Sequence, residues 1–159
     1  MKKFELTSEF ITNIFGTKLF RIKALIEFGN VKAGELGGFV EKEENLNHEG
    51  NAWVYGNAEV YGDARVYGNA SVYGNARVCG DARVCGNADY ATVHGFGSEY
   101  RTTTFFKTKA GEIGVRCGCF YGNLSEFRKK VVETHGETKK AKEYLMLADL
   151  MEFRFSDNS

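Results

Sequence analysis

A six-residue phrase repeats almost without change from Gly50 to Ala91, and it limits the possible folds of this chain more than any other feature. Its copies, which we call hexads, read GNAWVY, GNAEVY, GDARVY, GNASVY, GNARVC, GDARVC and GNADYA. The third and fifth positions hold Ala and an apolar residue, and alternate residues of a strand face the same side. Gly followed by Asn or Asp tolerates the positive φ of a tight bend. Each hexad therefore predicts a short strand and a corner.

No hexad can bury its apolar face alone, so the hexads must stack on one another. Stacking predicts two inward columns of side chains. The first column holds Ala52, Ala58, Ala64, Ala70, Ala76, Ala82 and Ala88, and the second holds Val54, Val60, Val66, Val72, Val78, Val84 and Tyr90.

This pattern resembles the hexapeptide-repeat family of left-handed parallel β-helices, in which three hexads make one triangular turn. The preceding stretch, FGNVKAGELGGFVEKEENLNHEGNAWV, is similar to the entry segment of a phage and bacterial subgroup whose members are often labelled transferases. The resemblance implies a mainly β fold class: a short left-handed parallel β-helix with an N-terminal β cap and a C-terminal α+β (ββαα) module.

Three hexads per turn make residues 18 apart neighbours on adjacent strands. Glu59 then lies beside Arg77, which is favourable, and Arg65 lies beside Arg83, which is unfavourable unless an anionic group intervenes. The domain boundaries that follow are 1–28 for the cap, 29–94 for the β-helix with strict hexads at 50–91, and 95–159 for the C-terminal module.

The two ends of the chain carry ordinary turn and cap signals. Gly16 and Thr17 separate FITNIF from KLFRIKALIEF, which indicates a hairpin. In the C-terminal module, YRTTTFFKTK and EIGVRCGCF predict two strands joined by a turn at 109–111. A helix is then expected from Asn123, with Glu126 completing a capping box, to about His135, and a second from Thr138 to Phe153. This module resembles one that recurs in small phage and bacterial proteins.

Composition excludes several classes of partner. Lys plus Arg and Asp plus Glu both total 21, so the expected partners exclude duplex nucleic acid. No apolar run is long enough to cross a membrane and the first residues lack a signal peptide, so we expect no membrane partner and a cytoplasmic protein in a bacterial host cell. Free thiols are then expected, with Cys79 and Cys85 on different faces and Cys117 and Cys119 on one face. Their spacing matches no common zinc pattern, so no metal is expected.

Four tyrosines at the sixth hexad position point outward. They are Tyr55, Tyr61, Tyr67 and Tyr73. Aromatic ladders are common on sheet faces, but an exposed aromatic stripe usually marks an interface, and we favour the interface. Because hexapeptide β-helices commonly assemble as trimers, the resemblance implies a homotrimer with these tyrosines at its oligomer interface.

The resemblance also raises the possibility of an acyltransferase that uses coenzyme A and a histidine base. His48 and His94 are the candidates, but they flank the hexads instead of lying among them. The array is also short for a coenzyme A groove. We therefore lean against catalysis and expect no cofactor.

A phosphate site in the C-terminal module is the alternative to catalysis, because arginine offers a forked donor and threonine adds hydroxyl groups. The candidate ligand-binding residues are Arg101, Thr102, Thr103, Thr104, Arg116, His135 and Lys139. Thr-rich strands and solvated helix lysines are also common without any function, so that interpretation stays open.

These observations lead to a functional hypothesis. The chain is expected to be a non-catalytic, phage-type homotrimer that sequesters a phosphate-bearing small molecule, such as a nucleotide immune signal of the bacterial host. The alternatives are a protein-binding inhibitor of a host protein or a structural spacer and, second, an acyltransferase.

Overall fold

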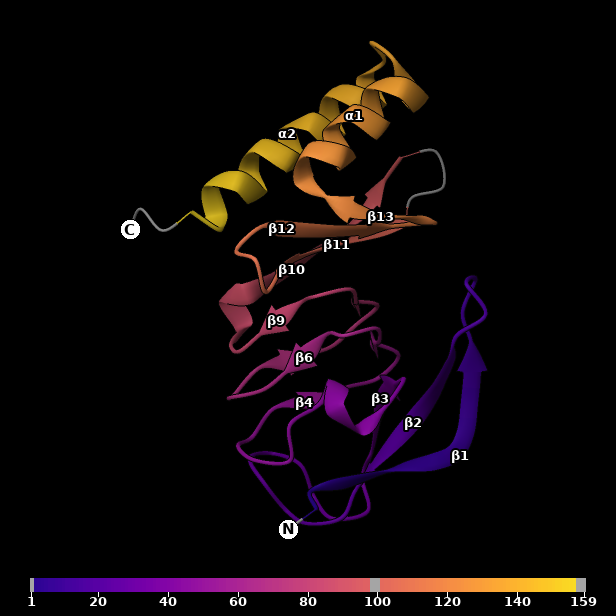
Figure 1. Cartoon of the computed structure of the whole chain (residues 1–159), viewed down its shortest axis with the longest axis vertical. Coiled ribbons are helices and arrows are strands. Elements are labelled where there is room, and N and C mark those ends of the chain that lie inside the picture. Colours follow the sequence, from indigo (N-terminus) through magenta and orange to yellow (C-terminus); the bar gives the residue numbers. More distant parts are fainter. Residues whose placement is uncertain (1, 98–100, 157–159) are drawn as a thin grey trace.

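The computed structural model describes residues 2–97 and 101–156. Figure 1 shows the hexad region (residues 50–91), an antiparallel sheet and two helices in succession along the long axis, with an N-terminal hairpin beside the hexad region. The two strands of the hairpin run beside the hexad region, and the turn between them points toward the sheet.

The N-terminal hairpin is present as predicted. Strand β1 (Phe4–Thr12) pairs antiparallel with β2 (Lys18–Ala24), and Gly16 has a φ of 82° in the turn between them. Strand β3 (Leu36–Val40) continues the sheet antiparallel to β2. A short 3-10 helix, Glu43–Asn45, follows.

Six hexads each contribute a strand of two residues. These are β4 (Trp53–Val54), β5 (Glu59–Val60), β6 (Arg65–Val66), β7 (Ser71–Val72), β8 (Arg77–Val78) and β9 (Arg83–Val84). The parallel pairs β4–β7, β5–β8 and β6–β9 join residues 18 apart, so the predicted neighbours Glu59 and Arg77, and Arg65 and Arg83, are confirmed. Arg83 donates to the carbonyl groups of Asp63 (2.8 Å) and Ala82 (2.9 Å), and these dipoles offset its like-charged neighbour.

The prediction of a left-handed parallel β-helix is wrong, because the described part of the chain has several small sheets (one mixed, one antiparallel and two isolated parallel pairs) that do not form a closed parallel solenoid. In the five-stranded sheet, β1-β2-β3-β5-β8, the parallel hexad strands continue an antiparallel hairpin, whereas β4–β7 and β6–β9 are separate pairs. The hexad strands are too short to build continuous parallel sheets, since glycines with positive φ interrupt them. The apolar period determines which side chains are buried, and leaves handedness and sheet continuity undetermined.

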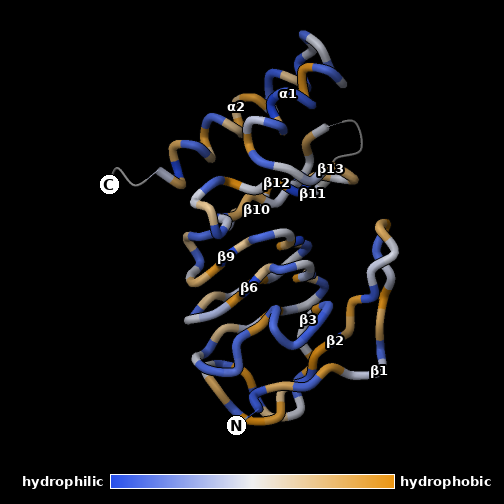
Figure 2. Tube along the Cα trace, viewed as in Figure 1, coloured by the Kyte–Doolittle hydropathy of each residue, from blue (hydrophilic) through white to orange (hydrophobic). Residues whose placement is uncertain are grey.

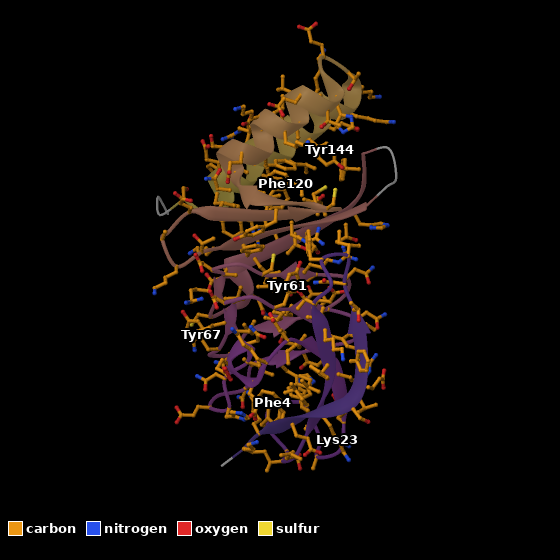
Figure 3. All side chains as sticks on the ribbon, turned by 45° about the vertical axis from the view of Figure 1, so that its right-hand side comes forward. Phe4, Lys23, Tyr61, Tyr67, Phe120 and Tyr144 are labelled. Carbon is orange, nitrogen blue, oxygen red and sulfur yellow. The ribbon has the colours of Figure 1, made fainter. Side chains whose placement is uncertain are left out.

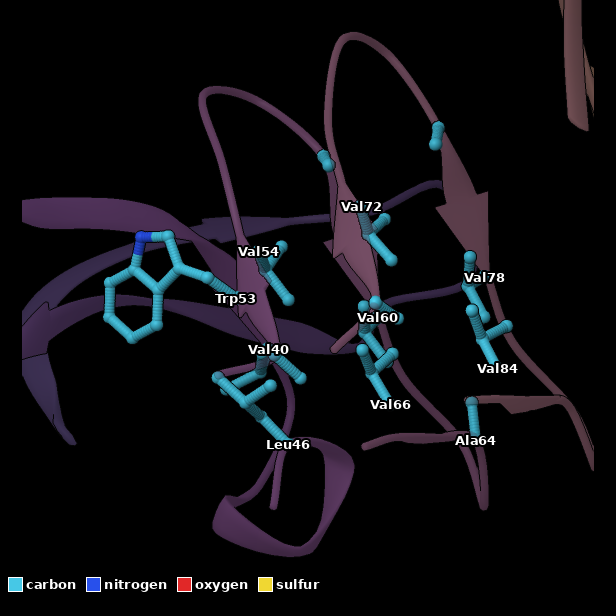
Figure 4. Close-up of a cluster of buried hydrophobic side chains, with 14 of the residues drawn as sticks. Val40, Leu46, Trp53, Val54, Val60, Ala64, Val66, Val72, Val78 and Val84 are labelled. Atoms are coloured by element: carbon cyan, nitrogen blue, oxygen red, sulfur yellow. The ribbon is translucent and has the colours of Figure 1, made fainter. Parts of the chain in front are cut away.

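The two inward columns are confirmed, with one exception. Every valine from Val54 to Val84 is fully buried, and Figure 4 shows valines of neighbouring strands pointing into one interior. Hydrophobic and hydrophilic segments alternate along the same region in Figure 2. The exception is Ala88, which is exposed because the seventh hexad turns into a 3-10 helix, Asn87–Asp89.

A buried asparagine closes the interior next to the first hexads. The Asn45 side chain accepts from the backbone N–H groups of Glu41 (3.1 Å) and Lys42 (2.9 Å). Its amide nitrogen donates to the carbonyl groups of Gly62 (3.1 Å) and Ala64 (2.9 Å). Two of these bonds are to the loop backbone and two are to the hexad backbone, so this side chain ties the two segments together.

The C-terminal sheet has four strands, so the ββαα module was predicted incompletely. Its order is β10 (Tyr90–Phe96), β11 (Arg101–Lys107), β12 (Ile113–Cys117) and β13 (Phe120–Asn123), all antiparallel. Strand β10 was not predicted from the sequence because its first two residues also complete the last hexad. Strand β13 was not predicted because it is only four residues long and its last residue is the N-cap of α1.

Both C-terminal helices begin and end close to the predicted residues. Helix α1 (Leu124–His135) has Asn123 and Glu126 as its capping box and Gly136 at its C-cap, and Thr138 caps α2 (Lys139–Arg154). The helices cover one face of the sheet, and its other face rests on the hexad region (Figure 1). In the part of the chain described, no helix is long and apolar enough to cross a membrane.

Candidate functional site

The C-terminal sheet separates the predicted ligand-binding residues onto its two faces. Thr104 and Arg116 are cross-strand partners on the hexad side, where the Thr104 hydroxyl accepts from the backbone N–H of Arg77 (3.0 Å). Thr103 lies on the helical side and donates to the Cys117 sulfur (3.2 Å). Figure 3 shows the two sides through their labelled tyrosines, Tyr61 toward the hexads and Tyr144 toward the helices.

The other predicted residues do not join Arg116. His135 stacks on Tyr144 beneath the helices, with 5.9 Å between the ring centroids, and Lys139 is exposed at the start of α2. Thr102 reaches the hexad side, where its hydroxyl lies 2.8 Å from Nδ1 of His94. The side chain of Arg101 lies outside the described residues. The predicted cluster is therefore reduced to Thr102, Thr104 and Arg116.

Arg116 is the most unusual side chain of this group. Only 2% of it is exposed, and its Nε donates to the hydroxyl of Tyr61 (2.8 Å). The ring of Phe15, at the tip of the N-terminal hairpin, lies 5.0 Å from the guanidinium carbon. The Nη1 atom is buried and has no hydrogen-bond partner among the described residues. A buried charged donor without a partner is costly, so this group destabilises the fold unless something binds it.

The surroundings of Arg116 hold an excess of positive charge. Glu59 lies near both Arg116 and Arg77, with 3.8 Å between its carboxylate and Nε of Arg77. Burial raises the pKa of Glu59, and the two arginines oppose that shift. Burial also raises the pKa of Tyr61, and raises the pKa of the Cys79 thiol to about 11, so both groups are neutral at pH 7. Two cations thus face one carboxylate.

Two cavities open on either side of the hairpin tip, and we call them together the tip groove. The first, of about 380 Å³, is lined by Phe15, Tyr61, Gly62, Cys79, Gly80, Cys119 and Tyr121. The second, of about 500 Å³, is lined by Ile14, Asn75, Arg77, Thr102, Gly118 and Cys119. Cys119 borders both cavities, and the hairpin tip contributes one residue to each. The tip groove therefore gathers residues from the hairpin, the hexads and the C-terminal sheet.

A larger cavity, of about 620 Å³, lies elsewhere, beside His48, Glu43, Lys2 and Arg65. Nδ1 of His48 accepts from the backbone N–H of Lys3 (3.0 Å), and its Nε2 lies 3.3 Å from the Glu43 carboxylate. Both ring nitrogens are thus engaged within the protein. This arrangement leaves no free nitrogen for a general base at His48.

The cysteines lie in different environments. Cys79 is buried, Cys117 is half-buried on the helical side, and Cys85 and Cys119 are exposed. Cys117 and Cys119 were expected on one face of a strand. Cys119 instead lies in the turn after β12, although both cysteines line one cavity of about 190 Å³ on the helical side. Among the described residues, no group of three or more His, Cys, Asp or Glu side chains is arranged to hold a metal ion.

The four hexad tyrosines do not form one exposed stripe. Tyr61 is buried against Arg116, Tyr55 and Tyr67 are half-buried, and Tyr73 is 62% exposed. Tyr61 is therefore covered within the single chain. A role of these tyrosines in an oligomer interface stays a prediction.

Sequence reasoning missed several residues of the tip groove. Arg77 had a signal, because the hexad spacing already placed it beside Glu59. Phe15, Tyr121 and Cys119 had none, since nothing in the sequence says where the hairpin tip comes to rest.

Comparison with models of known protein families produced no match, and comparison with curated proteins produced none either. The resemblance to the hexapeptide-repeat family therefore has no support beyond the repeat itself.

Proposed function

We propose that this protein is a non-catalytic binding protein that sequesters a small phosphate-bearing molecule in the tip groove. The observation that carries the proposal is the buried Nη1 of Arg116, which has no hydrogen-bond partner among the described residues and belongs to a guanidinium group next to Phe15 and Tyr61 in the cavity wall. A phosphate oxygen would supply the missing acceptor, and arginine is well suited to bind phosphate because its donors match the spacing of two oxygens.

Charge and size support the same class of ligand. Arg77 and Arg116 outnumber Glu59, and the hydroxyl-bearing Thr102 lines the second cavity. The two cavities of about 380 and 500 Å³ lie within the range of small-molecule sites. A nucleotide signal in the cytoplasm of a bacterial host fits this size and charge, and it is the ligand that we expect.

Titration calorimetry of the full chain with mononucleotides, cyclic nucleotides and ADP-ribose tests the proposal. Replacing Arg116 by Met keeps most of the side-chain volume and removes the donors, so binding should weaken roughly 10- to 100-fold. Arg65→Met is the matched control, because Arg65 is exposed and lines the separate cavity of about 620 Å³ beside His48. Absence of heat with every compound, or equal affinity in Arg116→Met, contradicts the proposal.

A protein-binding role is the second candidate, and the outer face of α2 favours it. Met146, Leu150 and Phe153 are 70%, 54% and 78% exposed and follow one another at helical spacing. Exposed apolar side chains gathered on one helix face usually mark a binding surface. Leu150→Ser should abolish a cross-linked, stoichiometric complex with a host protein while leaving ligand binding unchanged. The homotrimer stays a prediction that light scattering can test.

A further inference from the structure

Two partly exposed aromatic rings line the same cavity of the tip groove. Phe15 is 53% exposed at the hairpin tip, and Tyr121 is 46% exposed on β13. Both border the cavity of about 380 Å³ that also contains Tyr61 and Cys79. Small-molecule sites are lined predominantly by apolar and aromatic side chains.

The Tyr121 ring is held in a fixed orientation. It stacks on Phe106, with 6.5 Å between the centroids and 12° between the planes, and Phe106 is fully buried in the core. A Cβ atom built on Gly80 would overlap the Tyr121 hydroxyl, so only glycine leaves room for this ring. The ring therefore forms a rigid wall of the cavity.

The backbone of the hairpin tip is also well defined. The side-chain oxygen of Asn13 accepts from the backbone N–H groups of Phe15 and Thr17, both at 3.0 Å. These bonds close the turn around Gly16 and direct Phe15 toward Arg116. The tip thus presents an aromatic ring opposite the sheet.

We propose that this cavity takes a planar, uncharged aromatic ring between Phe15 and Tyr121, joined to an anionic group that bonds to Nη1 of Arg116. The inference rests on the proposed function and narrows its ligand to phosphates that carry an aromatic ring, such as mononucleotides. Phe15 and Tyr121 are then the residues that determine specificity.

The walls of the cavity agree with this ligand class. Apart from its two glycines, the lining consists of aromatic and cysteine side chains without a formal charge, whereas the charged groups lie at Arg116 and Arg77 beside it. Gly62 and Gly80 add bare backbone, which leaves a smooth surface for a flat ring. A sugar phosphate would use the cation and leave the aromatic surface uncovered.

The test compares AMP and phenyl phosphate with ribose 5-phosphate on the full chain by titration calorimetry. We expect the two ring-bearing compounds to bind at least about tenfold more tightly, since stacking on aromatic side chains strengthens binding by that order or more. Phe15→Leu and Tyr121→Leu should each weaken AMP binding about 5- to 100-fold and leave ribose 5-phosphate unchanged. Phe10→Leu is the control, because Phe10 is an exposed ring of the same hairpin outside the cavity lining.

The outcomes separate the two levels of the proposal. If none of the three compounds binds the unmodified chain, the proposed function and this inference both fail. If AMP and ribose 5-phosphate bind equally and Phe15→Leu changes neither, phosphate binding stands and the aromatic site is overturned. Tyr121→Phe keeps the ring and should retain AMP affinity, so a loss of binding there would also contradict the stacking role.

Discussion

The hexad interior and the tip groove solve the same problem of burial in opposite ways. In the hexads, the buried columns are alanine and valine, and the polar Asn45 that enters beside them satisfies four backbone groups. The unpartnered polar atom there, Nε1 of Trp53, belongs to a neutral ring. At the tip groove, a charged arginine is buried with a donor left free. The contrast teaches that the repeat, apart from Nε1 of Trp53, satisfies its buried polar groups internally, whereas the groove leaves one charged donor unsatisfied among the described residues, as the proposed binding role requires.

The sharpest test of the hexad side of this comparison is Asn45→Ala. The substitution leaves two N–H groups and two carbonyl groups without their partner, so it should lower the free energy of unfolding by about 3 kcal/mol. Urea denaturation measures the change. Asn57→Ala, at an exposed hexad corner, should stay within about 0.5 kcal/mol, and equal effects at both sites would contradict the account.

Val66→Ala probes the apolar column with a smaller expected effect. Val66 is fully buried between neighbouring strands, so losing two methyl groups should lower the free energy of unfolding by about 2 kcal/mol. Val132→Ala removes the same atoms from an exposed site on α1 and serves as the control in the same urea titration. A Val66 variant as stable as the control would show that the column is not the core.

Arg116→Met tests the groove side of the comparison, where removing a buried side chain should not destabilise the protein. It replaces a buried cation that has a free donor by an apolar side chain of similar length, so the unliganded protein should be as stable as before or about 1 kcal/mol more stable. The lost bond to Tyr61 limits the gain. A destabilisation comparable to that of Val66→Ala would mean that Arg116 is a structural residue.

Thiol labelling tests whether Cys79, in the wall of the groove, is shielded from solvent. Cys79 is buried and its pKa is raised to about 11, whereas Cys85 and Cys119 are exposed. At pH 8 Cys79 should react on the order of 100-fold more slowly than the exposed thiols. Mass spectrometry of each labelled peptide measures the rates, and equal rates at the three cysteines would place Cys79 at the surface.

The same shift determines how Cys79 affects stability. From its ordinary value of 9.0 to about 11, the folded chain keeps a proton on Cys79 that the unfolded chain has released. The contribution of this group to stability is therefore complete below pH 9 and falls as pH rises toward 11. Cys79→Ala should reduce that part of the decline in a urea titration at each pH, and an unchanged decline would contradict the assignment.

How much the sequence could predict depended on whether a feature was local. The columns from Ala52 to Val84, the neighbours 18 residues apart and the caps at Asn123 and Thr138 all followed from short-range patterns. The family resemblance failed because the same period is compatible with mixed sheets built from two-residue strands. The proposed phosphate cluster failed in part because strand alternation places Thr103 and Thr104 on opposite faces of β11.

The tip groove was beyond sequence reasoning for a physical reason. It forms where three segments meet, with Phe15 and Arg116 about a hundred residues apart in the chain, and their contact depends on the length and direction of the hairpin. No periodic pattern in the sequence predicts the contact between Phe15 and Arg116. Arg116 could be named from its residue type and strand, whereas its burial and its free donor required the structure.

The central claim is that Arg116 is kept buried and unpartnered in order to bind an anionic ligand. Urea midpoints of the unmodified chain and of Arg116→Met, measured at rising AMP concentration, test it most directly. Ligand that binds only the folded state raises stability by about 2.7 kcal/mol at a hundred times its dissociation constant. The account predicts that the unmodified chain gains this stability and that Arg116→Met, equal or superior without AMP, gains little. Equal gains in both proteins, or no gain in the unmodified chain, would contradict it.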